Sequence, residues 1–340
     1  MRNFIYLLVF TQNEGIIGSS LVKKMKKLNV AVIGTGSWGK NHARVFTEMD
    51  NTTLAGLFDL DQKRANEMAK LYNTKLYSSV DEILKDENVQ AITIASPTST
   101  HARIAMQAIE NGKHVLIEKP MTSTVEEAEK IVDLEKSSNV VVSVGFIERF
   151  NPIVSRSREL VKKEELGELV LISARRLGPY WPDRLKDVDV IRDVSIHDID
   201  AFRYITDKEP KTVYARGGKL RHTYLDYAEI LLDFGNGVTG FIESNYLTPH
   251  KLRKLNLTCE NGVVEADYIS QDYLIEDEEW LRNKKLQWKE PLSAEMHAFA
   301  ESCLGNAPPV ITSIDGLKAL KIAISSIKSV ETHQIVDLNF

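Results

Sequence analysis

Short runs of apolar, often β-branched residues alternate with helical patterns through the first part of the chain. The runs with the composition of strands buried on both faces are residues 29–33, 52–58, 89–95, 114–117 and 140–144. Helical segments separate them, and one opens with the capping pair Thr124 and Glu127. Continuous apolar strands separated by helices predict a parallel sheet with helices on both faces and right-handed connections. We therefore expect a doubly wound α/β domain over residues 25–146.

The pattern changes after about residue 147. The strand-like segments that follow are residues 169–174, 212–216, 227–234, 238–246, 252–259 and 263–267. Asn236-Gly237 and Asn261-Gly262 separate two pairs of them, and Asn-Gly favours the tight turn of a β-hairpin. Hairpins make antiparallel pairs, so we expect residues 147–340 to form an α+β domain with a largely antiparallel sheet. Helices can cover one face of such a sheet and a second subunit the other, so we expect a homodimer or homotetramer through this sheet.

Composition narrows the class of partner. The chain has 340 residues, enough for two domains, and a net charge of −5 with a pI of about 6.0. That balance gives no general attraction to nucleic acid or to an anionic membrane. Its two cysteines, Cys259 and Cys303, are far apart and fit no metal-binding spacing. We expect reduced thiols, a cytoplasmic protein and no metal site.

The first 24 residues stand apart from the strand–helix pattern. The apolar run Ile5–Phe10 is too short for the core of a secretory signal or for a membrane span, and no small-residue cleavage site follows it. We expect residues 1–24 to be an N-terminal extension. A regulatory or partner-binding tail is the alternative.

A glycine-rich turn, Gly34-Thr35-Gly36-Ser37-Trp38-Gly39, directly follows the first strand and opens a helix. In this setting the first glycine permits a tight turn, the second lets a pyrophosphate approach the backbone, and the third lets the helix pack on the strand. The helix N-terminus adds free N–H donors and a partial positive charge. The turn therefore predicts a Rossmann dinucleotide site with contacts from Gly34, Gly36, Ser37, Trp38 and Gly39.

Asp59 ends the second strand, and its carboxylate can accept hydrogen bonds from both hydroxyls of the adenosine ribose. A carboxylate there also repels a 2′-phosphate, and the next residues, Leu60 and Asp61, supply no arginine to bind one. These features predict NAD rather than NADP as the cofactor. The alternative is a generic glycine turn followed by an aspartate that caps the next helix.

Three further segments carry candidate chemistry. Ser96-Pro97-Thr98 with His101 follows the third strand, and Glu118-Lys119-Pro120 follows the fourth. Ligands of open α/β sheets bind at the carboxyl ends of the strands, so both segments belong at the cleft. In the second domain, Asp193 and His197 are four residues apart and share one face of an expected amphipathic helix.

Taken in order, these motifs resemble the Gfo/Idh/MocA oxidoreductase family. The resemblance covers roughly residues 27–330 and includes Gly145-Phe146 and the closing segment Asp315-Gly316-Leu317-x-Ala319-Leu320. It implies a two-domain NAD-dependent dehydrogenase of a sugar or polyol. It also implies cofactor contacts from the ends of the third and fourth strands, at Pro97, Thr98, His101, Glu118 and Lys119.

In that family the lysine of the triplet and the histidine of the D-x3-H pair contact the substrate hydroxyl, which implies these roles for Lys119 and His197. Oxidation of an alcohol needs a group that takes the hydroxyl proton, and histidine suits this because its ordinary pKa lies near neutral pH. A lysine ammonium stabilises developing alkoxide charge. Asp193 can orient His197 or bind a neighbouring hydroxyl. The sequence leaves open which of Lys119 and His197 takes the proton.

One segment departs from the family pattern. Many members have paired glycines before the aspartate and a glycine within the motif, where this chain has Val190-Ile191-Arg192 and Ser195. The loop that shapes the substrate pocket therefore differs from that of those members. Because Asp198 and Asp200 accompany His197, a divalent metal site is an alternative, but helical spacing turns both carboxylates away from the histidine.

Several polar residues resemble those of the branch of the family that acts on nucleotide-linked amino sugars. A UDP-sugar brings about two negative charges, and arginine binds phosphate in bidentate fashion. The candidate substrate contacts are Arg149, Asn151, Arg175 and Arg176. The two adjacent arginines lie in a strand and face opposite ways, so only one is expected to reach the substrate.

The resemblance therefore implies oxidation of UDP-N-acetylglucosamine to its 3-keto form with NAD. The alternatives are the corresponding uronic acid as substrate, a dehydrogenase of a free sugar or inositol, and a non-catalytic NAD-binding regulator. The arginines have an alternative role as surface ion pairs of the sheet.

Overall fold

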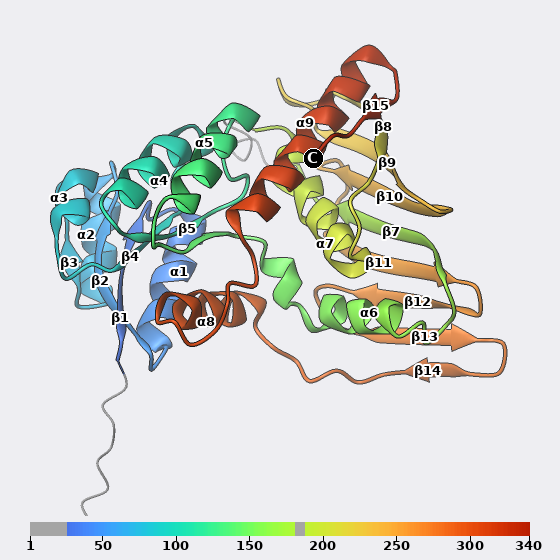
Figure 1. Cartoon of the computed structure of the whole chain (residues 1–340), viewed down its shortest axis with the longest axis horizontal. Helices are drawn as coiled ribbons and strands as arrows, with labels where there is room; N and C mark the ends of the chain where they lie inside the picture. Colours follow the sequence, from blue (N-terminus) through green and yellow to red (C-terminus); the bar gives the residue numbers. More distant parts are fainter. Residues whose placement is uncertain (1–25, 181–187) are drawn as a thin grey trace, which may run out of the picture.

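The computed structural model describes residues 26–180 and 188–340, which form two α/β domains side by side (Figure 1). The expected extension at residues 1–24 and the expected start of the first domain at Met25 lie outside the described residues.

The first domain is a six-stranded, wholly parallel sheet of order β3-β2-β1-β4-β5-β6. Its strands are β1 Leu28–Ile33, β2 Thr52–Phe58, β3 Lys75–Leu76, β4 Ala91–Ile94, β5 His114–Ile117 and β6 Val142–Val144. Its helices are α1 Ser37–Glu48, α2 Gln62–Leu71, α3 Val80–Lys85, α4 His101–Glu110 and α5 Val125–Lys136. The strand order reverses direction between β1 and β4, which is where Rossmann folds bind their ligands. The predicted doubly wound fold is confirmed.

Local sequence signals set the ends of these helices as expected. Thr124 and Glu127 form a reciprocal capping box at the start of α5. Gly112 follows the end of α4 with a φ of 69°, a backbone conformation that glycine adopts at little cost.

The second domain is a nine-stranded sheet of order β14-β13-β12-β11-β7-β10-β9-β8-β15. Its strands are β7 Leu169–Leu177, β8 Thr212–Gly218, β9 Tyr227–Gly235, β10 Val238–Asn245, β11 Leu252–Cys259, β12 Gly262–Asp267, β13 Tyr273–Asp277, β14 Leu281–Asn283 and β15 Val336–Asp337. Every pair is antiparallel except β7 with β10. Both predicted hairpins are present, and the largely antiparallel sheet is confirmed.

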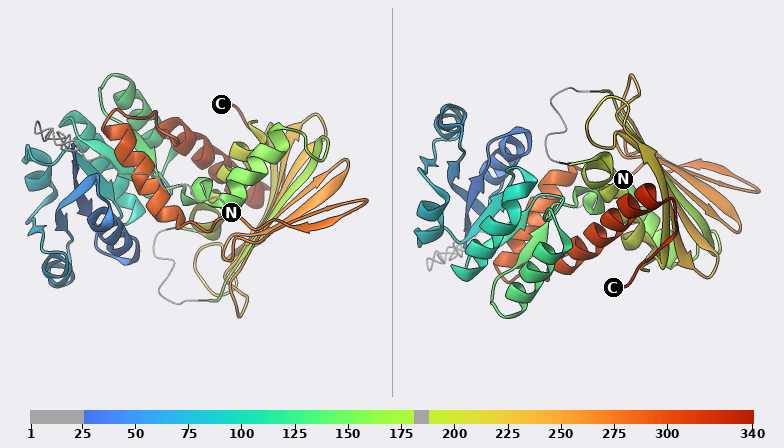
Figure 2. Two further views of the ribbon diagram at one scale, coloured as in Figure 1. Left: turned by 90° about the horizontal axis from the view of Figure 1, so that it is seen from below. Right: turned by 90° about the horizontal axis from the view of Figure 1, so that it is seen from above.

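Helices cover one face of this sheet, on the side toward the first domain (Figure 2). They are α6 Pro152–Lys162, α7 Ile196–Thr206 and α9 Ser313–Thr332. The other face carries no helix among the described residues. Outward-facing apolar residues on it include Leu171, Leu231 and Phe241, of which Leu231 is 45% exposed.

The structure corrects the expectation of an amphipathic helix at Asp193–Asp200. A π-helical turn, Ile191–Ser195, precedes α7, and every residue of α7 except Tyr204 is buried. This helix lies between the sheet and the first domain, so water is excluded on all its sides. Its charged side chains, Asp198, Asp200 and Arg203, are accommodated because they form buried ion pairs.

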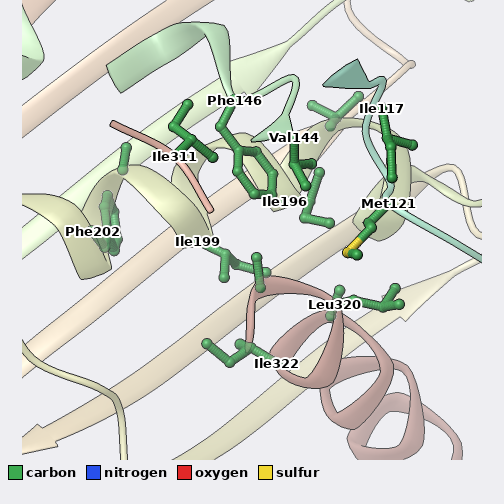
Figure 3. Packing of buried hydrophobic residues seen from close by; sticks show 14 of the residues in the cluster. Ile117, Met121, Val144, Phe146, Ile196, Ile199, Phe202, Ile311, Leu320 and Ile322 are labelled. Carbon is green, nitrogen blue, oxygen red and sulfur yellow. The ribbon is translucent and has the colours of Figure 1, made fainter. Parts of the chain in front are cut away.

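One apolar core continues across the boundary between the domains (Figure 3). Met121, Val144 and Phe146 of the first domain belong to the same cluster as Ile196 of α7 and Leu320 of α9. A further helix, α8 Pro291–Cys303, lies in the second range of the sequence but packs its apolar residues into the core of the first domain beside α1. This continuous packing fixes how the two domains face one another.

Within residues 26–180 and 188–340, no helix is long and apolar enough to cross a membrane. The same residues contain no group of three His, Cys, Asp or Glu side chains placed to hold a metal ion.

Candidate active site

The glycine turn after β1 has the geometry that a dinucleotide requires. Gly34 has a φ of 92°, and a Cβ there would lie 2.7 Å from the backbone of Ala95 and Ser96. A Cβ on Gly39 would lie 1.8 Å from the carbonyl oxygen of Gly34, so helix α1 can approach β1 only with glycine there. Beside Gly36, in contrast, a Cβ would meet nothing within 4 Å. The residues therefore fit a pyrophosphate on the backbone at Gly36, at the N-terminus of α1.

A groove runs from this turn across the ends of β1, β2 and β4. Four of the predicted cofactor residues line this groove: Gly34, Gly36, Asp59 and Pro97. The other residues that line it are Ile33, Phe58, Leu60, Arg64, Val80, Ala95, Ser96, Thr100, Arg103 and Ile104. Its apolar walls suit an adenine ring, and Asp59 stands at the end of β2, where a ribose would lie.

Asp59 has a neighbour that the sequence analysis missed. Arg64, in the first turn of α2, donates from Nη2 to both oxygens of Asp59 at 2.9 Å. Burial alone would raise the pKa of Asp59, but hydrogen bonds from the backbone of Thr35 and from Arg64 outweigh it and hold this pKa below its ordinary value. The sequence analysis considered only Leu60 and Asp61, whereas the first turn of α2 returns Arg64 to the strand end. A ribose 2′-substituent would therefore meet a carboxylate and a guanidinium together.

His101 and Thr98 are placed differently from the expectation. His101 is 1% exposed, and its ring nitrogens contact the carbonyl oxygens of Pro120 at 3.0 Å and Ser96 at 2.8 Å. It therefore joins the loop after β4 to the loop after β5, and this replaces its predicted cofactor contact. Thr98 is buried at the start of a short 3-10 helix, Thr98–Thr100.

Lys119, Asp193 and His197 meet in a pocket between the two domains, as predicted. Nζ of Lys119 donates to Oδ1 and to the backbone oxygen of Asp193, both at 2.7 Å. The residues that line this pocket are Trp38, Lys119, Ile147, Glu148, Arg176, Asp193, Val194, His197, Lys251 and Arg253. Trp38, in the first turn of α1, is 38% exposed and lines the pocket, which connects the glycine turn to it. Ser37 beside it is also exposed to solvent.

Glu118 faces the protein interior, and its predicted contact with the cofactor stays a prediction. Its Oε1 lies 2.9 Å from Nε2 of His42, and its Oε2 accepts the backbone N–H of Lys119 at 3.2 Å. Nδ1 of His42 in turn lies 2.7 Å from Oγ1 of Thr93. A Cβ on Gly145 would come within 3.1 Å of the Glu118 carboxylate. Glu118 is therefore held on three sides and fixes the backbone from which Lys119 projects.

Tyr246, which the sequence analysis did not single out, holds Asp193 from the other side. It directly follows β10, is 2% exposed, and its hydroxyl donates to Oδ2 of Asp193. Asp193 is thereby fixed between Tyr246 and Lys119. No signal in the sequence marks this tyrosine, because a strand-terminal tyrosine is also an ordinary core residue.

His197 is held in the neutral form. Its side chain lines the pocket, yet the residue is only 9% exposed, and Nδ1 is buried with no hydrogen-bond partner in the described part of the chain. Burial lowers the pKa of His197 well below its ordinary value, and the charges of Lys119 and Arg176 lower it further against the opposing effect of Asp193. At neutral pH its imidazole can therefore accept a proton.

Of the four residues predicted to contact the substrate, Arg176 lines the pocket and the other three do not. Arg176 lines the pocket, where it donates to both oxygens of Asp198 and to Glu148. Arg175 faces the other side of the sheet and pairs with Glu243 at 2.6 Å, so the expectation that the two face opposite ways is confirmed. Arg175 therefore fits the alternative in which these arginines form surface ion pairs of the sheet.

Arg149 and Asn151 are not among the residues that line this pocket, and their substrate contacts stay predictions. Arg149 is 6% exposed and is held by Asp200 and Asp315. Asn151 caps α6 and donates to the backbone oxygen of Tyr268 at 3.0 Å. Both side chains have their hydrogen bonds satisfied within the second domain.

Comparison with known proteins agrees with this geometry. The family model described as oxidoreductase family, NAD-binding Rossmann fold (GFO_IDH_MocA), matches residues 28–146, and the GFO/IDH/MocA C-terminal domain matches residues 154–265. UDP-N-acetylglucosamine 3-dehydrogenase of Acidithiobacillus ferrooxidans is 28% identical over 317 residues, covering 90% of this chain and 98% of that protein. Myo-inositol 2-dehydrogenase of Thermotoga maritima is 26% identical over 329 residues, covering 92% and 98%.

Solved structures share the whole fold. The structure of the Acidithiobacillus ferrooxidans UDP-N-acetylglucosamine 3-dehydrogenase superposes with a TM-score of 0.83 over 91% of this chain and 99% of that one, at 28% identity. Levoglucosan dehydrogenase in complex with NADH and L-sorbose gives a TM-score of 0.84 over 93% of this chain and 100% of that one. At 20% identity, the second likeness shows a common fold.

Proposed function

Because the chain belongs to the Gfo/Idh/MocA oxidoreductase family, we propose that it oxidises a secondary hydroxyl of a nucleotide sugar with NAD, most directly UDP-N-acetylglucosamine to its 3-keto form. The observation that carries this proposal is the contact of Lys119 with Asp193 beside a neutral His197, in a pocket that Trp38 of the glycine turn also lines.

The geometry supports a division of labour between two residues. His197 is the base, because its low pKa leaves the imidazole free to take the hydroxyl proton at neutral pH. Lys119 donates to the same oxygen and stabilises the charge that develops there. Asp193 holds the ammonium group of Lys119 and is itself held by Tyr246. Gly34, Gly36 and Asp59 would hold NAD, whose nicotinamide would supply the acceptor for the hydride that leaves the carbinol carbon.

Two observations support a nucleotide sugar over a free polyol. The relative that dehydrogenates UDP-N-acetylglucosamine is 28% identical to this chain, against 26% for two inositol dehydrogenases. The pocket also has more cationic than acidic side chains, which favours a substrate with a negatively charged group. Several inositol dehydrogenases match over a similar length, so a free polyol is the second candidate.

NADH formation with a panel of substrates separates these candidates. The panel contains UDP-N-acetylglucosamine, its uronic acid counterpart, N-acetylglucosamine and myo-inositol, each with NAD. We expect the highest kcat/KM with UDP-N-acetylglucosamine. A higher value with myo-inositol would reject the nucleotide-sugar proposal. Equal rates of wild type and Lys119→Ala with every substrate would instead favour a non-catalytic NAD-binding regulator.

The open face of the nine-stranded sheet supports a homodimer or homotetramer. Leu231 and Phe241 are cross-strand neighbours on this face, and Leu171 extends the apolar surface onto β7. Light scattering after gel filtration should show more than one chain per particle, and Phe241→Arg should reduce the mass. A wild-type monomer would reject this proposal.

We also place the protein in the cytoplasm, since Cys259 and Cys303 are both free thiols.

A further inference from the structure

Arg176 joins three elements at the wall of the catalytic pocket. It lies in β7 and is 5% exposed. Its Nε and Nη2 donate to the two oxygens of Asp198 in α7 at 2.7 and 2.9 Å, and its Nη1 donates to Oε1 of Glu148 at 2.7 Å. Glu148 belongs to a short 3-10 helix, Ile147–Phe150, between β6 and α6. Carboxylates therefore engage three of the five N–H groups of this guanidinium.

An aromatic ring holds the same guanidinium from a further side. Cζ of Arg176 lies 4.5 Å from the ring centroid of Tyr268, which is 6% exposed. Burial alone would lower the pKa of Arg176, but Asp198 and Glu148 raise it well above its ordinary value, so the group stays charged. Arg176 is thus a fixed cation between two carboxylates and a ring, with little freedom to turn toward a ligand.

The imidazole of His197, in the same pocket, has no side-chain hydrogen bond that orients its buried nitrogen. Nδ1 of His197 has no hydrogen-bond partner in the described part of the chain. A catalytic histidine is often oriented by a carboxylate that accepts from its second ring nitrogen. Here the next carboxylate along the chain, that of Asp198, engages Arg176 instead. The direction of the imidazole is therefore set by the first turn of α7, which the pair of Asp198 and Arg176 ties to β7.

Charged groups of both signs surround this imidazole. The charged residues of the pocket wall, together with Asp198 beside it, are Lys119, Glu148, Arg176, Asp193, Asp198, Lys251 and Arg253. Burial is the largest cause of the lowered pKa of His197, and the charges of Lys119 and Arg176 come next. Without the guanidinium, the carboxylates of Asp198 and Glu148 would lose the cation that both contact, and they would favour the protonated imidazole.

We propose that Arg176 is a positioning residue for the oxidation: its fork on Asp198 fixes the helix turn that aims His197 at the substrate hydroxyl, and its charge balances the two carboxylates that it contacts. This inference rests on the proposed function, in which His197 takes the hydroxyl proton. It assigns the guanidinium to the protein's own carboxylates. Direct binding of an anionic group of the substrate is the competing role.

Two substitutions separate the fork from the charge. Arg176→Lys keeps the charge and loses the planar fork, so kcat should fall about tenfold or more, because a small displacement of a catalytic group is costly. Its acidic limb of kcat/KM should stay where it is in wild type. Arg176→Gln loses the charge as well, so its acidic limb should also move to higher pH. In both variants KM should stay within about twofold, for whichever substrate of the panel has the highest kcat/KM.

The matched control is Arg156→Lys. Arg156 is also buried, at 9% exposed, and its two Nη atoms donate to the two oxygens of Glu165. It is not among the residues that line the catalytic pocket. Arg156→Lys should lose thermal stability as Arg176→Lys does, but it should keep the wild-type kcat and pH profile. This comparison separates an effect on the base from the general effect of a broken buried ion pair.

A double variant keeps the test independent of folding. Arg176→Gln alone leaves a buried carboxylate without its cation, whereas Arg176→Gln/Asp198→Asn leaves a neutral amide pair. In the double variant kcat should fall about tenfold with KM within about twofold, because a neutral pair holds the turn less tightly. A tenfold rise in KM with wild-type kcat, in Arg176→Lys and in the double variant, would overturn the proposal and assign Arg176 to the substrate. Wild-type kcat in both variants would overturn it as well.

NMR titration of the histidines separates failure of this inference from failure of the proposed function, because it needs no turnover. The chain has eight histidines, and His197→Asn identifies the signal of His197. The pKa of His197 should be higher in Arg176→Gln than in wild type and unchanged in Arg176→Lys. If wild type oxidises no substrate of the panel, the proposed function fails, and the titration still tests the effect of Arg176 on the imidazole. If wild type is active and the pKa of His197 is the same in Arg176→Gln, only this inference fails.

Discussion

Nζ of Lys119 lies 2.7 Å from Oδ1 of Asp193, and this contact joins the end of β5 in the first domain to the π-turn before α7 in the second. The continuous core of Figure 3 holds these elements at a fixed separation, so the contact is built into the fold. The site is therefore preorganised, and its residues need little rearrangement to meet a hydroxyl. The predictions below concern what holds this arrangement and what it does.

The buried contact between His42 and Glu118 should support both stability and catalysis. In His42→Asn, the carboxylate of Glu118 loses its 2.9 Å partner in a buried site, which should cost about 1–3 kcal/mol of unfolding free energy. Because Glu118 also holds the backbone of Lys119, kcat should fall as well. Urea unfolding and steady-state kinetics check this. His297→Asn, at an exposed position of α8, is the control and should change neither quantity. Wild-type kcat in a stable His42→Asn would contradict a positioning role.

The pH dependence of kcat/KM should follow the lowered pKa of His197. The group must be deprotonated to act as a base, so activity should persist as pH falls below 6.5, the ordinary pKa of histidine, and decline only at more acidic pH. The free energy of unfolding should also fall with pH. As pH is lowered, His197 takes up a proton in the unfolded chain at a higher pH than in the folded chain, so this residue destabilises the fold below pH 6.5. An acidic limb of kcat/KM that is centred above pH 6.5, and that persists when the other titratable residues of the pocket are replaced, would contradict this assignment.

Asp59 and Arg64 should set the preference between NAD and NADP. Asp59→Ala removes the ribose acceptor and the carboxylate that Arg64 contacts through both oxygens, so KM for NAD should rise about tenfold and use of NADP should improve. Arg64→Ala is the companion variant and should weaken NADP more than NAD. The ratio of kcat/KM for the two cofactors measures both. A ratio unchanged in Asp59→Ala would mean that the ribose is recognised elsewhere.

Glu295 of α8 should limit stability at alkaline pH. It is 2% exposed, and neither carboxylate oxygen has a hydrogen-bond partner among the described residues. Burial raises its pKa well above the ordinary 4.5, so the proton it holds in the folded state favours folding at low pH, and this advantage is lost as pH rises. Glu295→Gln should raise the melting temperature at pH 8 by a few degrees and change it less at pH 5. A smaller gain at pH 8 than at pH 5 would contradict the direction of this shift.

The sequence was sufficient for the first domain because its signals are local. Five apolar runs became strands, and the glycine turn adopted the expected geometry, since tight turns and close packing depend on neighbouring residues. Short strands at the ends of both sheets were missed: the edge strand β3 of the first sheet, the edge strands β14 and β15 of the second, and β13, which pairs with β14. Edge strands bury little apolar surface, so their patterns are weak, and pairing with a neighbour decides them.

Side-chain partners far apart in sequence limited the prediction of the site. Arg149 and Arg176 both looked available for phosphate, but Asp200 and Asp198 of α7 hold them. Periodicity placed these two aspartates away from His197 and could not say which basic residues they would meet. Tyr246 and Arg253 were missed for the same reason, because the register of β10 and β11 against β7 is fixed by packing of the whole sheet.

The double variant Lys119→Ala/His197→Ala tests the central claim, that these two residues act on one substrate oxygen. The measurement is kcat/KM for NADH formation from UDP-N-acetylglucosamine in wild type, both single variants and the double variant. Each single change should lower kcat/KM at least about a hundredfold. The kcat/KM of the double variant should be only slightly lower than that of the less active single variant, because the effects of residues that act as a unit are not additive. Losses that multiply in the double variant, or a single variant with wild-type kcat/KM, would contradict the account.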